Sequence, residues 1–209
     1  MIKVGIIDYG AGNIASVKKV VDYVGGAPVV ISTPEAILQM DRIILPGVGA
    51  AGAALTHLHA HHLIEALTER VRKQARPFLG ICLGMQLLSN KLYEFGEYLG
   101  FGWIPGEVVH LKHVTDHSIR VPHMGWNEVE FREDSLPFIN SLKKNQPYYF
   151  AHSFSFKVTD PTMIVGTVDY GSKTVAAVKS ETVFATQFHP EKSHLAGQDL
   201  IEAFLHWNP

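Results

Sequence analysis

The first half of the chain alternates short, continuous hydrophobic runs with segments in which hydrophobic residues recur every three or four positions. A continuous run predicts a buried strand, and the three-four spacing predicts one face of a helix. Strands that alternate with helices pair in parallel, so the pattern predicts an α/β fold with an open, doubly wound sheet. The expected strands are residues 3–8, 29–31, 42–45 and 77–81.

The segments between these strands carry helix boundaries. The first helix is expected to end at Gly25-Gly26, because glycine readily adopts the backbone conformation that follows the last turn of a helix. A second starts at Thr33-Pro34, because proline fits the first helical position. A long helix is expected over residues 53–73. The first helix has the apolar face Ile14, Val17, Val21 and Val24, followed by Gly25-Gly26.

After about residue 95, glycine, proline and β-branched residues become frequent, which predicts antiparallel strands added to the parallel core. Residues 175–178 and 183–186 form an expected hairpin. No linker rich in proline, glycine or serine divides the sequence, so residues 1–209 are expected to form a single domain. A last helix is expected to bury the face made by Leu200, Ile201, Phe204 and Leu205.

Composition narrows the class of protein. The formal net charge of −2 gives no basic surface of the kind that binds nucleic acid. One cysteine excludes an intramolecular disulfide framework and fits a reducing compartment. No apolar run approaches the length of a membrane span, and the start of the chain lacks the apolar stretch of a signal peptide. A cytoplasmic protein without membrane contacts is expected.

The single cysteine lies in the sequence Gly80-Ile81-Cys82-Leu83-Gly84, at the end of an expected strand and before an expected helix. This spacing is typical of a nucleophile elbow, a sharp turn whose neighbours must be small because a Cβ there would clash. A thiol in this position lies at a helix N-terminus, which favours the thiolate. A buried structural cysteine is the alternative interpretation.

A second segment, ending in His189-Pro190-Glu191, follows an apolar strand. In an extended chain the side chains of His189 and Glu191 point to the same side, about 6.5 Å apart. Glu191 is therefore placed to orient one imidazole nitrogen while the other faces a thiol. This is the logic of a catalytic triad, in the chain order Cys82, His189, Glu191.

Two glycine-rich stretches support a rival interpretation as a dinucleotide site. Residues 47–52 match G-x-G-x-x-G, and residues 10–15 match its variant ending in alanine. In neither case does an acidic residue end the following strand, as such a site requires. Backbone N–H groups at 47–49 are better suited to an oxyanion hole, because no side chain blocks the approach of a substrate carbonyl. A plain tight turn remains the structural alternative.

Histidines gather at positions 57–62, where His57 and His61 share one helix face and make a metal pair conceivable. No glutamate separates them in the H-E-x-x-H pattern and no cysteine is near, so a solvated face is expected. His110, His113 and His117 lie in polar sequence and receive the same interpretation. The sequence predicts neither a metal nor a cofactor.

Several motifs resemble those of a known family. GICLGMQ at 80–86, QFHPEKS at 187–193 and PGVG at 46–49 resemble the class I, or triad, glutamine amidotransferases, whose sheet is flavodoxin-like. DYGAGN at 8–13 and HMGWNEV at 123–129 are similar to the glutaminase subunits of imidazole glycerol phosphate synthase. The resemblance covers essentially the whole chain.

The resemblance implies hydrolysis of L-glutamine through a cysteine thioester, with the ammonia passed to a (β/α)8-barrel cyclase subunit in a heterodimer of histidine biosynthesis. It implies an oxyanion hole at Gly47, Val48 and Gly49, with the amide of Leu83. The implied substrate-binding residues are Gln86, Ser153 and Phe154, and the implied partner-facing residues are Asn13, His123, Trp126, Asn127 and Lys192.

Three alternatives stay open on the sequence alone. A close paralogue would supply ammonia to a different synthase, such as a sugar amidation enzyme. A cysteine hydrolase or peptidase, or a non-catalytic binding module, would use the same fold. One departure from the family pattern is Ala50-Ala51, where a bulkier aromatic residue is expected behind the oxyanion segment.

Overall fold

The computed structural model describes residues 1–115, 119–133 and 138–209. Its first half confirms the predicted alternation of strands and helices. The second helix starts as expected, because Pro34 occupies its first turn and the Thr33 hydroxyl accepts a hydrogen bond from the Ala36 amide. The elements are β1 (Lys3–Ile7), α1 (Ile14–Tyr23), β2 (Ala27–Ile31), α2 (Pro34–Ile37), β3 (Arg42–Gly47), α3 (Ala51–Ala60), α4 (Leu63–Leu67), η1 (Thr68–Lys73), β4 (Phe78–Cys82) and α5 (Leu83–Gln86).

The long helix expected over residues 53–73 is wrong in detail. α3 and α4 are separated at His61 and His62, and η1 continues α4 as a π-helix. His62 has a φ of 54°, in the left-handed region that breaks a right-handed helix. Nothing in the local sequence announces this break, because a histidine run carries neither proline nor glycine.

The second half is built mainly of strands, and the expected hairpin is confirmed as β13 (Lys173–Ser180) paired with β14 (Val183–Thr186). The expected last helix is also confirmed as α6 (His194–His206). The other strands are β5 (Lys91–Leu92), β6 (Tyr98–Leu99), β7 (Gly106–His110), β8 (His123–Glu128), β9 (Glu130–Phe131), β10 (Pro147–His152), β11 (Phe154–Val158) and β12 (Ile164–Asp169). Short 3-10 turns are η2 (Leu111–His113), η3 (Ile139–Ser141), η4 (Pro161–Met163) and η5 (Pro190–Lys192).

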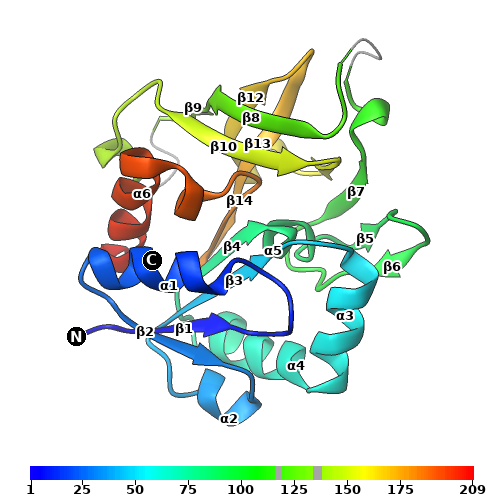
Figure 1. Ribbon diagram of the computed structural model, residues 1–209. Helices are drawn as coiled ribbons and strands as arrows, with labels where there is room; N and C mark the ends of the chain where they lie inside the picture. Colours follow the sequence, from blue (N-terminus) through cyan, green and yellow to red (C-terminus); the bar gives the residue numbers. More distant parts are fainter. Residues whose placement is uncertain (116–118, 134–137) are drawn as a thin grey trace.

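An eight-stranded sheet runs through the molecule in the order β2-β1-β3-β4-β14-β13-β12-β9 (Figure 1). The first five strands in this order, β2, β1, β3, β4 and β14, pair in parallel. The last three, β13, β12 and β9, extend the sheet with antiparallel pairs. The predicted mainly parallel α/β sheet is thus confirmed. The expectation for the added strands holds only in part, since β10-β8 and β11-β7-β5-β6 form two separate small sheets.

Helices cover both faces of the main sheet, as a doubly wound fold requires (Figure 1). On one face, Val17 and Val21 of α1 pack in one buried cluster with Leu200 and Phe204 of α6. On the other face, residues of α3 and α4 belong to a second buried cluster. In the described part of the chain, no helix is both long and apolar enough to cross a membrane.

The sheet order determines where a site can form. β3, β4 and β14 are neighbours, and Gly47 at the end of β3 lies opposite Cys82 at the end of β4. β14 leads directly toward His189. The carboxyl ends of neighbouring parallel strands therefore bring the PGVG segment, the cysteine and the histidine to one edge of the sheet.

Candidate active site

Cys82 lies at a sharp turn between β4 and α5, with a φ of 54° and a ψ of −105°. The close packing around the turn explains its small neighbours. A Cβ added at Gly84 would lie 1.9 Å from the Leu45 carbonyl oxygen, and one added at Gly80 would lie 2.8 Å from the Gly84 carbonyl oxygen. The geometry is that of the predicted nucleophile elbow.

His189 and Glu191 meet as predicted, although the local structure differs from the extended chain that the spacing suggested. Nδ1 of His189 lies 2.9 Å from Oε1 of Glu191, and both side chains are buried. Glu191 belongs to the 3-10 turn η5, which Pro190 begins. The turn, rather than strand alternation, brings the carboxylate behind the imidazole.

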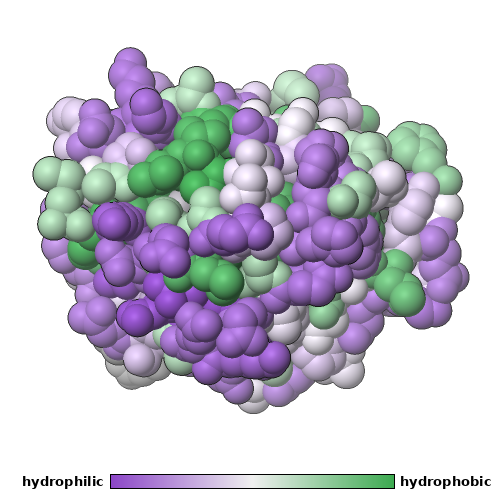
Figure 2. All heavy atoms as spheres, turned by 90° about the horizontal axis from the view of Figure 1, so that it is seen from below, coloured by the Kyte–Doolittle hydropathy of each residue, from purple (hydrophilic) through white to green (hydrophobic). Residues whose placement is uncertain are grey.

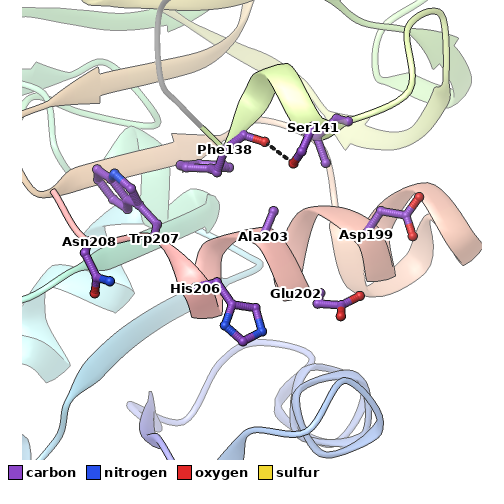
Figure 3. A pocket seen from close by; sticks show the side chains of 9 residues that line it. Phe138, Ser141, Asp199, Glu202, Ala203, His206, Trp207 and Asn208 are labelled. Atoms are coloured by element: carbon purple, nitrogen blue, oxygen red, sulfur yellow. Dashed lines mark hydrogen bonds between the residues drawn. The ribbon is translucent and has the colours of Figure 1, made fainter.

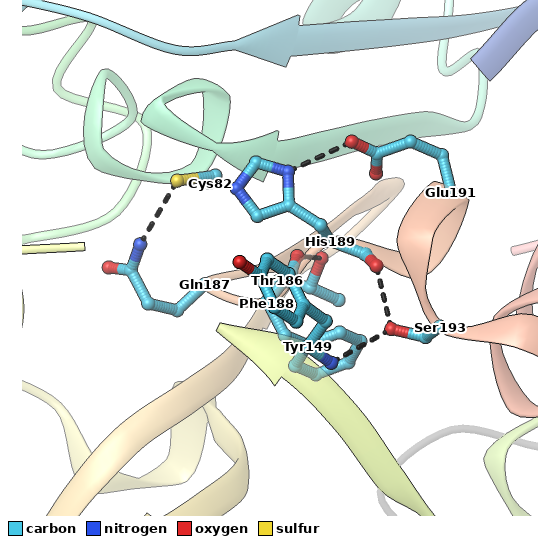
Figure 4. A network of polar contacts seen from close by, with 8 residues as sticks. All are labelled: Cys82, Tyr149, Thr186, Gln187, Phe188, His189, Glu191 and Ser193. Atoms are coloured by element: carbon cyan, nitrogen blue, oxygen red, sulfur yellow. Dashed lines mark hydrogen bonds and ion pairs between the residues drawn. The ribbon is translucent and has the colours of Figure 1, made fainter. Parts of the chain in front are cut away.

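The other side of the His189 ring faces Cys82 (Figure 4). Burial alone lowers the pKa of His189, but the hydrogen bonds and charges of Cys82 and Glu191 outweigh burial and raise the pKa to about 10. A proton on the imidazole is therefore favoured at neutral pH when the sulfur is a thiolate. The three side chains lie in one line of sulfur, imidazole and carboxylate, with the imidazole hydrogen-bonded to the carboxylate.

Ser193 fixes the segment that carries the histidine (Figure 4). Its hydroxyl donates to the His189 carbonyl oxygen at 2.7 Å and accepts from the Tyr149 amide at 3.0 Å. The His189 amide donates in turn to the Tyr149 carbonyl oxygen at 2.8 Å. Strand β10 and the turn η5 are thus joined by buried bonds that restrict the position of the imidazole.

The expected oxyanion residues lie beside the elbow. Gly47 ends β3, Val48 is 38% exposed, and Gly49 has a φ of +88°, which favours glycine. Leu83 is the first residue of α5, so its amide is among the unpaired N–H groups of that helix start.

Tyr9 lies beneath this oxyanion segment, and sequence reasoning gave it no role. A Cβ added at Gly47 would lie 2.4 Å from the Tyr9 hydroxyl oxygen and 2.8 Å from the Leu83 Cβ. The hydroxyl is buried without a hydrogen-bond partner among the described residues. Burial, and next the charge of Cys82, raise the pKa of Tyr9. Because of these two short Cβ distances, only glycine fits at position 47.

The packing behind the 47–49 segment shows what takes the place of the bulkier aromatic residue expected near Ala50-Ala51. Ala51 is buried, and its amide donates to the Glu94 carboxylate at 2.6 Å. An aromatic ring comes from elsewhere in the chain: a Cβ added at Gly52 would lie 2.5 Å from the Tyr98 ring. Tyr98 of β6 therefore fills space that a side chain of α3 would otherwise occupy.

A cleft of about 540 Å³ opens above the elbow. It brings Cys82 and the expected substrate-binding residues Gln86, Ser153 and Phe154 to one wall. Val48, Gly49 and Leu83 also line it. A larger cavity of about 690 Å³ lies against α6, near Phe138 and Trp207, and contains none of the expected site residues (Figure 3).

Most residues expected to face a partner lie on or beside β8. Trp126 is 44% exposed and stacks on His194, and Lys192 lies over the Tyr149 ring. Asn13 precedes α1, and its side chain makes no capping hydrogen bond.

His123 departs from its expected place on the partner-facing surface. Its side chain is only 1% exposed and is stacked between the rings of Phe150 and Tyr170. Nε2 of His123 lies 2.9 Å from Oδ1 of Asn127. Strand alternation explains the difference, because it directs His123 inward and leaves Met124 exposed.

The histidine-rich segment shows no metal site. His57 and His61 rings pack together with centroids 4.3 Å apart. No group of three or more potential metal-ligating side chains occurs within residues 1–115, 119–133 and 138–209. His110 and His113 also pack edge to face, and His117 lies outside the described residues.

The doubly wound sheet, with a cysteine at a sharp turn beside a buried histidine–glutamate pair, fits the class of amidotransferases. The sequence model of glutamine amidotransferase class-I matches residues 5–207, and the chain belongs to this family. Solved structures agree at the level of the fold. PurLQS from Thermotoga maritima has a TM-score of 0.74 at 20% identity, covering 97% of this chain and 95% of that one.

Two curated relatives narrow the comparison. Imidazole glycerol phosphate synthase subunit HisH from Zymomonas mobilis subsp. mobilis is 41% identical over 210 residues, covering 99% of this chain and 96% of that protein. The subunit of the same name from Aquifex aeolicus is 40% identical over 200 residues, covering 95% and 94%. The chain is similar to these subunits over nearly its whole length.

Proposed function

We propose that this chain is the glutaminase subunit of an imidazole glycerol phosphate synthase. It hydrolyses L-glutamine to glutamate and ammonia and supplies the ammonia to a partner subunit in histidine biosynthesis. The observation that carries this proposal is the buried line of Cys82, His189 and Glu191 at the floor of an open cleft. The similarity to HisH subunits supports the choice of synthase. The reduced thiol that this chemistry needs agrees with the expected cytoplasmic location.

The reaction begins with glutamine's carboxamide above Cys82. His189, held by Glu191, takes the thiol proton of Cys82, and the imidazolium that forms is stabilised beside the attacking thiolate. The sulfur attacks the carboxamide carbon, and negative charge develops on the carboxamide oxygen. Backbone N–H groups of the 47–49 segment and of Leu83 stabilise that charge.

The imidazolium of His189 then donates its proton to the leaving nitrogen. The carbon–nitrogen bond breaks, ammonia departs, and a glutamyl thioester remains on Cys82. Neutral His189 next takes a proton from water, which attacks the thioester and releases glutamate. Glu191 stabilises each imidazolium through the 2.9 Å contact with Nδ1.

Three residues of the cleft wall are proposed to hold the substrate. Gln86, one turn after the elbow, lies near the polar end of a glutamine bound over Cys82. Ser153 and Phe154, where β11 begins, line the same cleft and are proposed to contact the substrate through backbone N–H groups, since the Phe154 carbonyl is bonded to Gln86 and His152. The amino-acid end of glutamine carries both charges, so hydrogen bonding there discriminates against other amides.

The partner is proposed to be a (β/α)8-barrel cyclase that docks on the face carrying Asn13, Trp126, Asn127 and Lys192. Ammonia released into water is mostly protonated at neutral pH, and ammonium is not a nucleophile. A glutaminase without its own acceptor site therefore needs a docked synthase that receives ammonia directly. Val48, whose side chain is exposed in the oxyanion segment, is proposed to adjust when the partner binds.

Two measurements test this proposal. Glutamate release should be lost in Cys82→Ala and unchanged in His59→Gln, an exposed histidine away from the cleft. The rate should also rise when a purified cyclase subunit of such a synthase, with its substrate, is added. Turnover by Cys82→Ala contradicts the assigned nucleophile, and equal rates with and without the cyclase contradict the coupling. Complementation of a histidine auxotroph separates this synthase from a sugar amidation pathway.

A further inference from the structure

Gln187 lies against the nucleophile, and sequence reasoning gave it no role. It follows β14 and is two residues before His189, with a fully buried side chain. Nε2 of Gln187 donates to Sγ of Cys82 at 3.6 Å (Figure 4). Burying a side-chain amide costs free energy unless its polar atoms form hydrogen bonds, so the partners of Gln187 are informative.

A neighbouring backbone carbonyl determines which end of the Gln187 amide meets the sulfur. The Phe154 carbonyl oxygen can only accept, so the Gln86 atom that contacts it at 3.2 Å must be Nε2. The second hydrogen of that nitrogen meets Gln187 at 3.0 Å, where only Oε1 can accept it. The remaining end of the Gln187 amide, Nε2, therefore faces Cys82.

The Phe154 carbonyl is itself held by a second chain of hydrogen bonds. It accepts from Nδ1 of His152 at 2.8 Å. Burial lowers the pKa of His152 to about 3, so the neutral ring has its one proton on Nδ1. Nε2 of His152 lies 3.0 Å from Nδ1 of His123 on β8. The Phe154 carbonyl oxygen, which orients Gln86 and through it Gln187, is thus itself held in place by His152.

We propose that Gln187 is a further catalytic residue, whose side-chain N–H stabilises negative charge on the Cys82 sulfur. Gln86 is the positioning residue that keeps this N–H turned toward the sulfur. The inference rests on the proposed function, because it concerns the same nucleophile. Sulfur is negatively charged before attack on the carboxamide and again as the thioester breaks, so the hydrogen bond acts at both points.

The reactivity of the thiol gives a test that does not depend on turnover. The rate of Cys82 alkylation by iodoacetamide should be measured against pH in the native protein. Gln187→Met keeps the side-chain length and removes the N–H. A hydrogen bond to a charged group has a strength that corresponds to between about tenfold and a hundredfold in rate. The alkylation rate at neutral pH should fall by such a factor, with its midpoint moved to higher pH.

Two further variants and a control make the experiment decisive. Gln187→Glu places a carboxylate beside the sulfur and should slow alkylation at least as much as Gln187→Met. Gln86→Met frees the Gln187 amide to rotate and should shift the profile in the same direction by less. Gln39→Met, at an exposed glutamine, should match the unsubstituted protein. If Gln187→Met does not fold, the Gln86 variant still measures the effect.

The proposal also predicts which step slows. Because the N–H also assists departure of sulfur from the thioester, a glutamyl adduct already formed on Cys82 should disappear more slowly in Gln187→Met, as followed by mass spectrometry of the quenched reaction. The role of Gln187 would be overturned if the alkylation profiles of Gln187→Met and Gln86→Met both superimposed on that of the unsubstituted protein. Turnover by Cys82→Ala would instead overturn the proposed function, so the two failures are distinguishable.

Discussion

His152 illustrates how one buried side chain makes stability depend on pH. Burial lowers its pKa to about 3, whereas an unfolded histidine titrates near about 6.5. Below pH 6.5 the unfolded chain therefore binds a proton that the folded chain excludes. Its contribution to the free energy of unfolding is complete above the unfolded pKa and is lost as the pH falls toward the folded value.

This difference predicts a measurable loss in mild acid. Between pH 7.5 and pH 5, titration of His152 should remove about 2 kcal/mol from the free energy of unfolding. His152→Gln should reduce the acid dependence by that amount, as measured by urea unfolding at both values of pH. His59→Gln, an exposed histidine, is the matched control. An unchanged acid dependence in His152→Gln would contradict the buried neutral state.

Single residues also show what a sequence can predict about a site. The meeting of Cys82 with His189 and Glu191 was predictable from spacing, because small residues at an elbow and a carboxylate two positions from a histidine have direct chemical meanings. Gln187 and Tyr9 were missed, because their importance depends on which atoms the fold brings beside the sulfur and beside Gly47. A buried glutamine has no distinguishing pattern along the chain.

At the scale of elements, the break between α3 and α4 predicts an effect on stability. His62 has a left-handed backbone with a φ of 54°, which costs a non-glycine residue about 1 kcal/mol. His62→Gly should therefore raise the free energy of unfolding by up to about 0.5 kcal/mol, after the added flexibility of the unfolded chain is subtracted. Thermal or urea unfolding measures this change.

The neighbouring histidine provides the control for this prediction. His61 is exposed like His62 but has a φ of −102°, which glycine does not relieve. His61→Gly should lower stability by about 0.5–1 kcal/mol. Equal changes in the two variants would mean that the left-handed turn does not limit the stability of this helix pair.

Elements differ in how far the sequence predicts them. Buried strands such as β1, β3 and β4 were found because they are continuous hydrophobic runs. The π-helix η1 and the strands β5 and β6 were not, because η1 keeps a helical pattern and two residues are too few to show the alternation of a strand. The two small sheets depend on pairing between β8 and β10 and between β7 and β11, which no local pattern determines.

At the scale of the whole molecule, hydrophobic side chains are unevenly exposed. The face seen in Figure 2 is mainly hydrophilic, with hydrophobic residues in separate areas. By contrast, Met124, Trp126 and Leu195 are 64%, 44% and 69% exposed on the segments that carry the proposed docking residues. Exposed hydrophobic patches commonly mark interaction sites, and tryptophan is among the residues that most often provide the binding energy of an interface.

Trp126 is therefore predicted to anchor the proposed cyclase partner. Trp126→Ala should weaken binding of the cyclase subunit by about 30-fold, equivalent to about 2 kcal/mol, as measured by calorimetry. Tyr23→Ala, at the end of α1, removes an aromatic ring that is 74% exposed and should leave the affinity unchanged. A normal affinity in Trp126→Ala would exclude β8 as the centre of the interface.

The presence of one cysteine among 209 residues has a practical consequence. A thiol reagent added to the native protein can modify only the residue on which turnover is proposed to depend. The molar ratio of incorporated label to polypeptide therefore counts the competent molecules in a preparation. Specific activities can be corrected with that titre, and a fluorophore attached there would report from one known position with no background from other thiols.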